Sequence, residues 1–285
     1  MKISEFFARK PVISFEVFPP KPTTPESAIN ETIDALTKLR PNFISVTYGA
    51  GGGTNFSRTA EITSKIKNEY GIESISHLPC LYMTKADVRN TLDGLKQIGV
   101  DNVLALRGDV SPSAPPCDDF KYADELIAFI KETDDFCVIA ACYPEGHPES
   151  ENLVEDIKYL KRKVDAGTDG LVTQFFLDNE YFYSFRERTE IAGITVPIQA
   201  GVMPVTNKSQ IERMVALCGI ELPRKFTKMI SKYESNPTAL RDAGIAYATE
   251  QIVDLIAQDI DGIHLYTMNN PYIAEKIYAA IQSLL

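Results

Sequence analysis

Short apolar stretches rich in β-branched residues recur along the whole chain, and each is followed by a segment with the polarity pattern of a helix. Apolar runs of this length, bounded by turn residues, are typical of strands that are buried on both faces of a parallel sheet. The pattern therefore predicts a parallel sheet covered by helices. The predicted strands are residues 12–18, 42–48, 73–79, 101–107, 136–143, 170–176, 197–203 and 262–268.

The ends of two predicted helices carry capping signals. Thr24 is expected to cap a helix whose first residue is Pro25, because proline lacks an amide hydrogen that would stay unpaired there. Thr84, followed three residues later by Asp87, resembles a capping box, and Gly99 is suited to the C-terminal stop of that helix.

Eight strand–helix units without a linker predict an α/β fold of the (β/α)8 TIM barrel type, a single domain over residues 1–285. An extra helix is expected between the last two strands, because Asn236-Pro237 interrupts the helical pattern of residues 219–261. Residues 110–119 are expected to form a long loop after the fourth strand. A doubly wound open sheet is the alternative fold, and the absence of a dinucleotide glycine fingerprint counts against it.

The glycine-rich stretch VTYGAGGGT, residues 46–54, lies at a strand-to-helix turn. Gly49 and Gly51 fit the first and third positions of the dinucleotide fingerprint, but Thr54 occupies the sixth. No lysine follows, so the stretch does not match a P-loop either. The loop has to be interpreted through the architecture around it.

Composition narrows the possible partners. The 285 residues include 29 Lys+Arg and 39 Asp+Glu, and the net charge of −10 argues against binding to nucleic acid. Five cysteines without a CxxC pair indicate reduced thiols. The charged N-terminus lacks a signal-peptide apolar run, and no stretch reaches the ~20 apolar residues of a membrane span. We expect a soluble, cytoplasmic protein with no nucleic-acid or membrane partner.

Polar residues at the strand ends are the candidates for chemistry, because the active site of such a barrel lies at the C-terminal ends of its strands. In the first strand, Ile13, Phe15 and Val17 are expected to face the helices, which places Glu16 inside the barrel near its mouth. Burial favours the protonated form of a carboxyl group, and such a group can act as a general acid. A structural salt bridge inside the barrel is the alternative role.

The fourth strand ends in the sequence Arg107-Gly108-Asp109. Alternation predicts that Arg107 and Asp109 project to the same side, and Gly108, which weakens a strand, allows a ligand to approach the backbone. We interpret this sequence as part of a functional site, with a simple ion pair between the two charged residues as the alternative.

Other strands end in single polar residues, namely Thr47, His77, Tyr143 and Gln174. Each is weak evidence alone, but their recurrence favours a polar site at this end of the barrel. The three histidines lie far apart without ligand-like spacing, so no metal site is expected.

The helix after the fifth strand places Asp156, Tyr159 and Lys163 along one flank, with Arg162 beside them. A basic last turn often only complements the helix dipole. From the residues alone, we interpret Lys161–Lys163 as solvated surface.

Motifs spread over almost the whole chain carry a resemblance to a known family: SFEVFPPK, FISVTYGAGG, HLPC, LALRGD, YPEGHPE, LKRKVDAGTDGLVTQFF, GVMPVTN and HLYTMN. In this order they resemble the flavin-dependent methylenetetrahydrofolate reductases, specifically the short bacterial type without a regulatory domain. The resemblance implies a (β/α)8 barrel with FAD at the C-terminal face. It also implies that NADH or NADPH supplies electrons through FAD to reduce methylenetetrahydrofolate to methyltetrahydrofolate, in one-carbon metabolism and methionine supply.

The same resemblance implies residue roles. Glu16 matches the general acid that protonates the departing folate nitrogen, and Asp109 matches a carboxylate that stabilises the cationic opened folate and tunes the flavin. The implied substrate contacts are Glu16, Asp109, Gln174, Gln210, Tyr266 and Asn270. The implied cofactor shell is Thr47, Tyr48, Ala50, His77, Arg107, Gly108, Asp109, Tyr122, Ala123, Tyr143, His147, Asp156, Tyr159, Arg162 and Lys163.

The resemblance revises two interpretations made from the residues alone. It turns Arg162 and Lys163 toward FAD, and it makes the glycine-rich loop a place where rings approach the backbone instead of a phosphate cradle. Three positions depart from the family pattern: Tyr159 replaces an asparagine, Met214 a phenylalanine and Asn270 an arginine. These departures leave the choice between NADH and NADPH and the contacts to the folate glutamate tail open.

Two other functions compete with this one. A pterin-binding methyltransferase barrel would move a methyl group without redox chemistry, and a flavoprotein subunit of an electron-transfer complex would accept electrons from a partner protein. We also expect a homo-oligomer.

Overall fold

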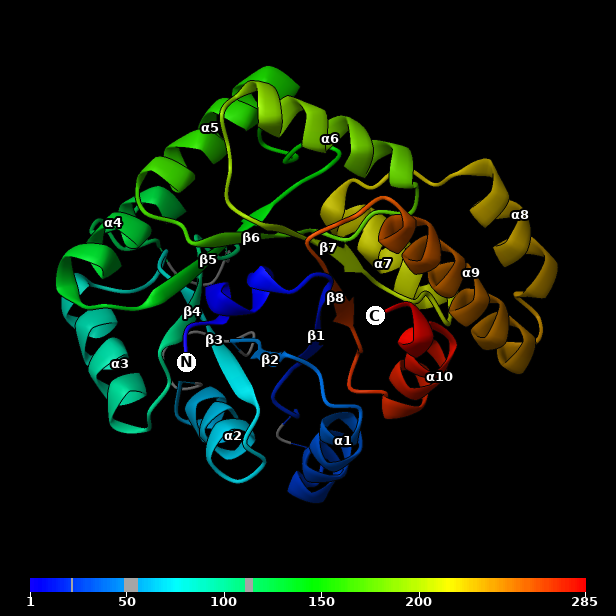
Figure 1. The fold of residues 1–285 in the computed structure, drawn as a ribbon, viewed down its shortest axis with the longest axis horizontal. Helices are drawn as coiled ribbons and strands as arrows, with labels where there is room; N and C mark the ends of the chain where they lie inside the picture. The colour runs from blue at the N-terminus through cyan, green and yellow to red at the C-terminus, as the bar shows by residue number, and fades with distance from the viewer. Residues whose placement is uncertain (22, 49–55, 111–114) are drawn as a thin grey trace.

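A computed structural model of the chain describes residues 1–21, 23–48, 56–110 and 115–285. Its eight parallel strands form a closed barrel in chain order, and β1 pairs with β8 to close it (Figure 1). The predicted (β/α)8 barrel is confirmed, and every strand lies within its predicted range. The strands are β1 (Val12–Val17), β2 (Phe43–Val46), β3 (Glu73–Pro79), β4 (Asn102–Leu106), β5 (Cys137–Cys142), β6 (Gly170–Thr173), β7 (Ile198–Val202) and β8 (Gly262–Tyr266).

Helices surround the barrel and cover the outer face of its sheet (Figure 1). Between β7 and β8 the chain forms three helices, which confirms the predicted elaboration. Asn236 caps the third of them, with Pro237 in its first turn. The helices are α1 (Glu26–Lys38), α2 (Phe56–Asn68), α3 (Lys85–Gln97), α4 (Ala123–Thr133), α5 (Leu153–Asp165), α6 (Asn179–Ile191), α7 (Lys208–Cys218), α8 (Arg224–Tyr233), α9 (Pro237–Ala257) and α10 (Pro271–Ile281), with 3-10 helices η1 (Ile3–Ala8) and η2 (Gln282–Leu284).

One of the two predicted helix caps is confirmed and the other is wrong. The Thr84 side chain accepts from the amide of Asp87, and the Asp87 carboxylate accepts in return from the amide of Thr84, as a capping box requires. Helix α1 instead begins at Glu26, with Pro25 in an extended conformation at the N-cap and no side-chain cap. Thr24 therefore lies one residue too early to cap it.

The predicted loop after β4 is confirmed where the structure describes it. Val110 and residues 115–119 lie outside any helix or strand, whereas residues 111–114 fall outside the described part of the chain.

The two sides of β1 pack into different apolar clusters, as alternation predicts. Ile13, Phe15 and Val17 belong to the cluster between sheet and helices, together with residues such as Ile33 of α1 and Ile273 of α10. The remaining positions of the strand, Glu16 among them, are thereby left for the barrel interior.

The end of the barrel where the strands begin is closed by the N-terminal segment. Ile3 and Phe7 of η1 pack with Val12 and Phe43 inside the barrel, and the Ile3 amide donates to Asn102 Oδ1 at 2.9 Å. Figure 1 shows η1 lying across this opening. A site with access to solvent therefore belongs at the opposite end, where the strands finish.

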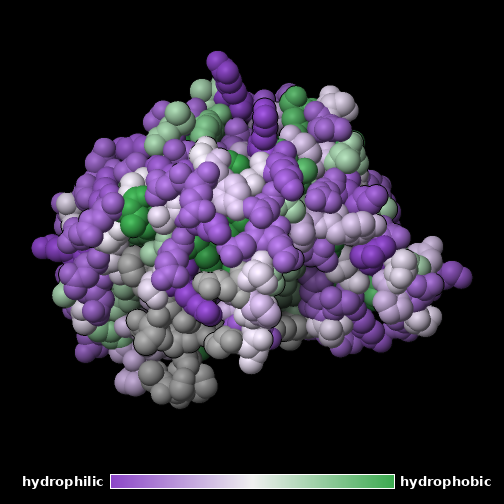
Figure 2. Space-filling model, turned by 90° about the horizontal axis from the view of Figure 1, so that it is seen from below, coloured by the Kyte–Doolittle hydropathy of each residue, from purple (hydrophilic) through white to green (hydrophobic). Residues whose placement is uncertain are grey.

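The surface of the molecule is predominantly polar. The face shown in Figure 2 is mostly hydrophilic, and its apolar residues form small patches separated by polar side chains. None of the described helices has the length and apolar character needed to cross a membrane.

Candidate active site

A cavity of about 750 Å³ opens at the C-terminal ends of the strands. This volume lies within the range of small-molecule and cofactor sites. The structure brings together around it most of the residues that the sequence singled out: Glu16, Thr47, His77, Arg107, Gly108, Asp109, Tyr122, Ala123, Tyr143, His147, Asp156, Tyr159, Arg162, Lys163, Gln174 and Tyr266.

Four predicted site residues are not part of this lining. Ala50 lies outside the described residues, together with the rest of the GAGGGT stretch. Tyr48 is partly buried, and burial raises the pKa of its phenol. The Gln210 side-chain oxygen accepts from the Thr206 amide at 3.2 Å, and Asn270 is the N-cap of α10. Contacts from these residues to a ligand stay predictions.

Glu16 points into the barrel from β1, with its side chain 18% exposed. Its Oε2 lies 3.6 Å from Nε2 of His77 and 3.6 Å from Nε2 of His264, which come from β3 and β8. The carboxyl group also lines the cavity. It therefore has imidazole nitrogens beside it and open space in front of it, as a group that exchanges a proton with a ligand requires.

His77 is neutral around pH 7. Burial lowers the pKa of its imidazole from 6.5 to about 4, and the opposing attraction of Glu16 is the smaller influence. Its Nε2 lies 2.6 Å from Ser45 Oγ, so the ring is held by a hydrogen bond to the neighbouring strand.

This depressed pKa predicts a pH dependence of stability. Between pH 6.5 and about 4 the unfolded imidazole binds a proton that the folded one does not, so stability falls as the pH is lowered. The contribution reaches at most about 1.4 kcal/mol per pH unit. Urea unfolding of cofactor-free protein from pH 7 to 4 measures it, and His77→Gln is expected to flatten the slope by this amount. Parallel curves for the two proteins would contradict the assignment.

Arg107 and Asp109 both line the cavity, as predicted, but strand alternation is not the reason. Leu104 packs in the interior cluster and Ala105 in the helix-facing one, so continued alternation would turn Arg107 toward the helices. The strand ends at Leu106, and Gly108 has a φ of +90°, a conformation that favours glycine. Arg107 thus follows the end of the strand, and the turn at Gly108 separates it from Asp109, so strand alternation does not govern the two residues.

The guanidinium of Arg107 pairs with Glu149 in the loop after β5, and not with Asp109. Both terminal nitrogens of Arg107 donate to the carboxylate, with Nη2 to Oε1 at 2.8 Å. This bidentate bond raises the pKa of Arg107 and lowers that of Glu149. The pair spans part of the cavity rim, because both residues line it.

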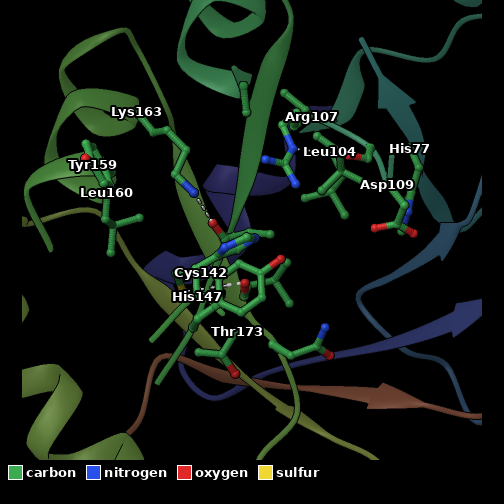
Figure 3. A pocket seen from close by; sticks show the side chains of 18 of the residues that line it. His77, Leu104, Arg107, Asp109, Cys142, His147, Tyr159, Leu160, Lys163 and Thr173 are labelled. Atoms are coloured by element: carbon green, nitrogen blue, oxygen red, sulfur yellow. Dashed lines mark hydrogen bonds between the residues drawn. The ribbon is translucent and has the colours of Figure 1, made fainter. Parts of the chain in front are cut away.

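The basic end of α5 divides into two kinds of side chain. Lys161 pairs with Asp165 away from the cavity, and Arg162 lines the cavity while pairing with Asp124 at 2.7 Å. Lys163 extends toward β5 and donates to the Ala141 carbonyl at 2.6 Å, on the opposite side of the cavity from Arg107 and His77 (Figure 3). Interpreting the whole turn as solvated surface is therefore wrong.

Lys163 has an unusual electrostatic environment. Burial lowers the pKa of its ammonium group. Asp156 and Asp124 attract it and oppose this shift only in part, and the structure shows no ion pair within 4.0 Å for Lys163 among the described residues. A buried cation without a directly paired carboxylate is well placed to bind an anionic ligand.

The loop after β5 is tied to α5 by a buried carboxylate. Asp156 Oδ1 accepts from the His147 amide at 3.1 Å and from Ser150 Oγ at 2.8 Å. The His147 ring packs edge-on against Tyr143, with centroids 4.6 Å apart. Asp156 thus helps to form the wall of the cavity. Helical spacing alone had placed it only along one flank of the helix.

Several residues of the lining were missed by sequence reasoning. Glu149 and Ser150 lie in an irregular loop that has no hydrophobic periodicity. Asp124 lies in α4, and only the three-dimensional arrangement of the barrel brings it to the cavity. Met203 lies just beyond the end of β7 and is buried, and no polarity signal marks it in the sequence. The only available signal for Glu149 was that it is the last residue of the YPEGHPE motif.

A (β/α)8 barrel that gathers a carboxyl group, imidazoles and three cations around a cavity at its strand ends is a barrel enzyme in its architecture. Residues 2–282 match the family described as methylenetetrahydrofolate reductase. The chain belongs to the methylenetetrahydrofolate reductase family.

Individual relatives agree with this assignment. The chain is 34% identical to 5,10-methylenetetrahydrofolate reductase of Pectobacterium carotovorum subsp. carotovorum over 272 residues, covering 95% of this chain and 89% of the relative. It is 35% identical to the Escherichia coli (strain K12) protein of the same name, covering 95% and 90%. Among solved structures, an uncharacterized Clostridium thermocellum protein that binds two copies of 5-methyl-5,6,7,8-tetrahydrofolic acid superimposes with a TM-score of 0.69 at 13% identity, covering 99% and 98%, which shows a shared fold.

Proposed function

We propose that this protein reduces methylenetetrahydrofolate to methyltetrahydrofolate, with FAD as its resident cofactor and NADH or NADPH as the electron donor. The observation that carries the proposal is the position of Glu16, a partly exposed carboxyl group that opens into the same cavity as Arg107, Arg162 and Lys163. An acid group and anion-binding groups are what a reaction with a folate and a dinucleotide requires. Family membership supports the same chemistry.

The residues around the cavity fit a flavin dinucleotide. Lys163 and Arg162 are neighbours on α5 and both line the cavity, so these two cations would hold a diphosphate in a chain of net charge −10. Arg107, across the cavity, would contact another part of the ligand. Leu104, Leu106 and Val172 add apolar surface for a ring system. FAD, when bound, supplies hydride-transfer chemistry that no side chain can provide.

The side chains would act on the folate. Glu16 would donate a proton to the amine nitrogen that leaves when the five-membered ring opens. Without this proton the nitrogen would have to leave as an anion, which is much slower. The ring-opened folate is a cation, and Asp109, which lines the same cavity, would stabilise it as a carboxylate. Gln174 is held at the cavity by accepting from the Phe175 amide at 3.0 Å and would contact the ligand.

The experiment that tests this function uses the purified chain in three steps. First, the purified protein is expected to be yellow or to take up FAD. Second, it is expected to lose the flavin colour when NADH or NADPH is added without oxygen. Third, it is expected to regain the colour when methylenetetrahydrofolate is added. Methyltetrahydrofolate should appear in step with the recovered colour. Running NADH and NADPH separately gives the donor preference.

Each competing function predicts a different result. A methyltransferase barrel would transfer a methyl group and ignore nicotinamide, and an electron-transfer subunit would bind FAD without oxidising NADH or NADPH. Failure to bind FAD would refute the proposal outright. Assembly into a homo-oligomer stays a prediction, which light scattering of the same sample tests.

A further inference from the structure

Three buried polar side chains on adjacent strands lie directly below Glu16 in the barrel. Ser14 precedes Glu16 by one inward-facing position on β1, His264 is its register partner on β8, and Gln199 comes from β7. All three are at most 2% exposed. Buried polar groups need hydrogen-bond partners, so the directions of the bonds among them can be derived.

The amide of Gln199 sets the first direction. Its nitrogen lies 3.4 Å from the carbonyl oxygens of both Val12 and Ile263. Carbonyl oxygens only accept, so the nitrogen of the amide must face them. The same nitrogen lies 3.1 Å from Ser14 Oγ, and the hydroxyl therefore accepts from Gln199.

The hydroxyl proton of Ser14 sets the second direction. Ser14 Oγ lies 2.7 Å from His264 Nδ1 and 3.5 Å from the Ile263 carbonyl, so donation to the imidazole gives its proton the shorter and stronger of the two bonds within reach. With this direction Nδ1 accepts, and the proton of the ring lies on Nε2. Stacking on Phe43 and an edge contact with Tyr266 fix the plane of the ring.

The Nε2 atom of His264 is where this chain of bonds ends. It is buried and has no hydrogen-bond partner among the described residues, yet it lies 3.6 Å from Oε2 of Glu16. An unpaired buried N–H is costly, and a small rotation of the Glu16 side chain would satisfy it. His77 approaches the same oxygen at 3.6 Å, but its Nε2 is already engaged with Ser45.

We infer that His264 is a positioning residue for Glu16: held as the Nε2–H tautomer by Gln199 and Ser14, it donates to Oε2 of the carboxyl group. The acidic proton then resides on Oε1. In the reaction, the Oε1–H bond breaks as an N–H bond forms on the folate amine nitrogen, and the resulting carboxylate keeps the His264 bond, which is stronger to a charged acceptor. The inference rests on the proposed function, but the tautomer is a property of the protein alone.

The tautomer can be measured without any ligand. The sequence has only three histidines, so long-range 1H–15N correlation spectra of protein labelled in its histidines, compared with a His264→Gln sample, identify the His264 ring. The expected result is a protonated Nε2 and an unprotonated Nδ1. In Ser14→Ala the Nδ1 loses its donor, and both tautomers are expected. A protonated Nδ1 in the wild-type protein would overturn the inference.

Kinetics separate positioning from a structural role. His264→Leu is expected to slow the oxidation of reduced enzyme by methylenetetrahydrofolate by about 10- to 100-fold while flavin reduction by the nicotinamide stays near wild type. His264→Gln, which can donate from its amide, is expected to recover part of the loss. Equal losses in both half-reactions, or a Gln variant no faster than the Leu variant, would overturn the inference.

A matched variant guards against misfolding as the explanation. Ser74 is also a fully buried strand serine, but its hydroxyl donates to the Thr63 carbonyl at 3.0 Å on the helix side. Ser74→Ala is expected to leave both half-reactions unchanged, whereas Ser14→Ala slows only the folate step. A wild-type protein that shows the expected tautomer but reduces no folate would refute the proposed function and leave the tautomer assignment standing.

Discussion

Glu16→Gln is expected to abolish most folate reduction and to leave the nicotinamide half-reaction intact. Glutamine has the size of glutamate and retains hydrogen-bonding atoms for the neighbouring imidazoles, but it cannot transfer a proton as an acid. General acid catalysis typically contributes about 10²–10⁴-fold, so the rate of folate-dependent reoxidation should fall by that factor. Anaerobic stopped-flow spectroscopy of the flavin colour follows the two half-reactions separately.

Glu73→Gln is a closely matched control for this substitution. The Glu73 side chain is 17% exposed, against 18% for Glu16, but it lies at the first residue of β3, at the closed end of the barrel. It pairs with the N-terminal amine and with Lys67, so its loss should affect stability only. Folate turnover near wild type in Glu16→Gln would show that another group supplies the proton.

The fold was readable from the sequence because both faces of every barrel strand are covered. Coverage by helices outside and side chains inside makes most strands short runs in which apolar residues dominate, and turn residues separate the runs. The interior position of Glu16 followed from the same alternation, since Ile13, Phe15 and Val17 occupy the helix side. Local patterns were sufficient wherever the local structure was regular.

The parts that sequence reasoning missed depend on contacts between distant segments. The partner of Arg107 is Glu149, 42 residues later in an irregular loop, and the residues that hold His264 come from two other strands. Arg107 itself lies just beyond the end of β4 at Leu106, where strand alternation no longer applies. The true start of α1, one residue after Pro25, depends on backbone angles that a capping pattern does not encode.

The second large effect is expected on cofactor binding, in Lys163→Met. Methionine matches the length of the aliphatic stem without a charge, so the variant loses a charged hydrogen bond to an anionic ligand. Such a bond is worth about 1.5–3 kcal/mol, which corresponds to a loss of about 10- to 100-fold in FAD affinity. Titration of apoprotein with FAD, followed by the quenching of flavin fluorescence, measures the change.

In Lys163→Met the stability of the apoprotein is expected to change little, in contrast to the affinity for FAD. Burial disfavours the charged form of Lys163, so its removal relieves a desolvation cost and offsets the lost bond to the Ala141 carbonyl. The free energy of unfolding should therefore change by no more than about 1 kcal/mol. A loss of affinity accompanied by a large loss of stability would indicate a collapsed site and not a missing ligand contact.

Lys161→Met supplies the control, because it changes the net charge by the same amount from the same helix. Lys161 pairs with Asp165 on the surface and does not line the cavity, and a surface pair is worth about 0–1 kcal/mol. FAD affinity should stay at the wild-type value in this variant. That result would show that Lys163 acts through a direct contact with the ligand and not through the net charge of the protein. If both variants lose affinity equally, the field is responsible; if neither does, the diphosphate lies elsewhere and the assignment of Lys163 is wrong.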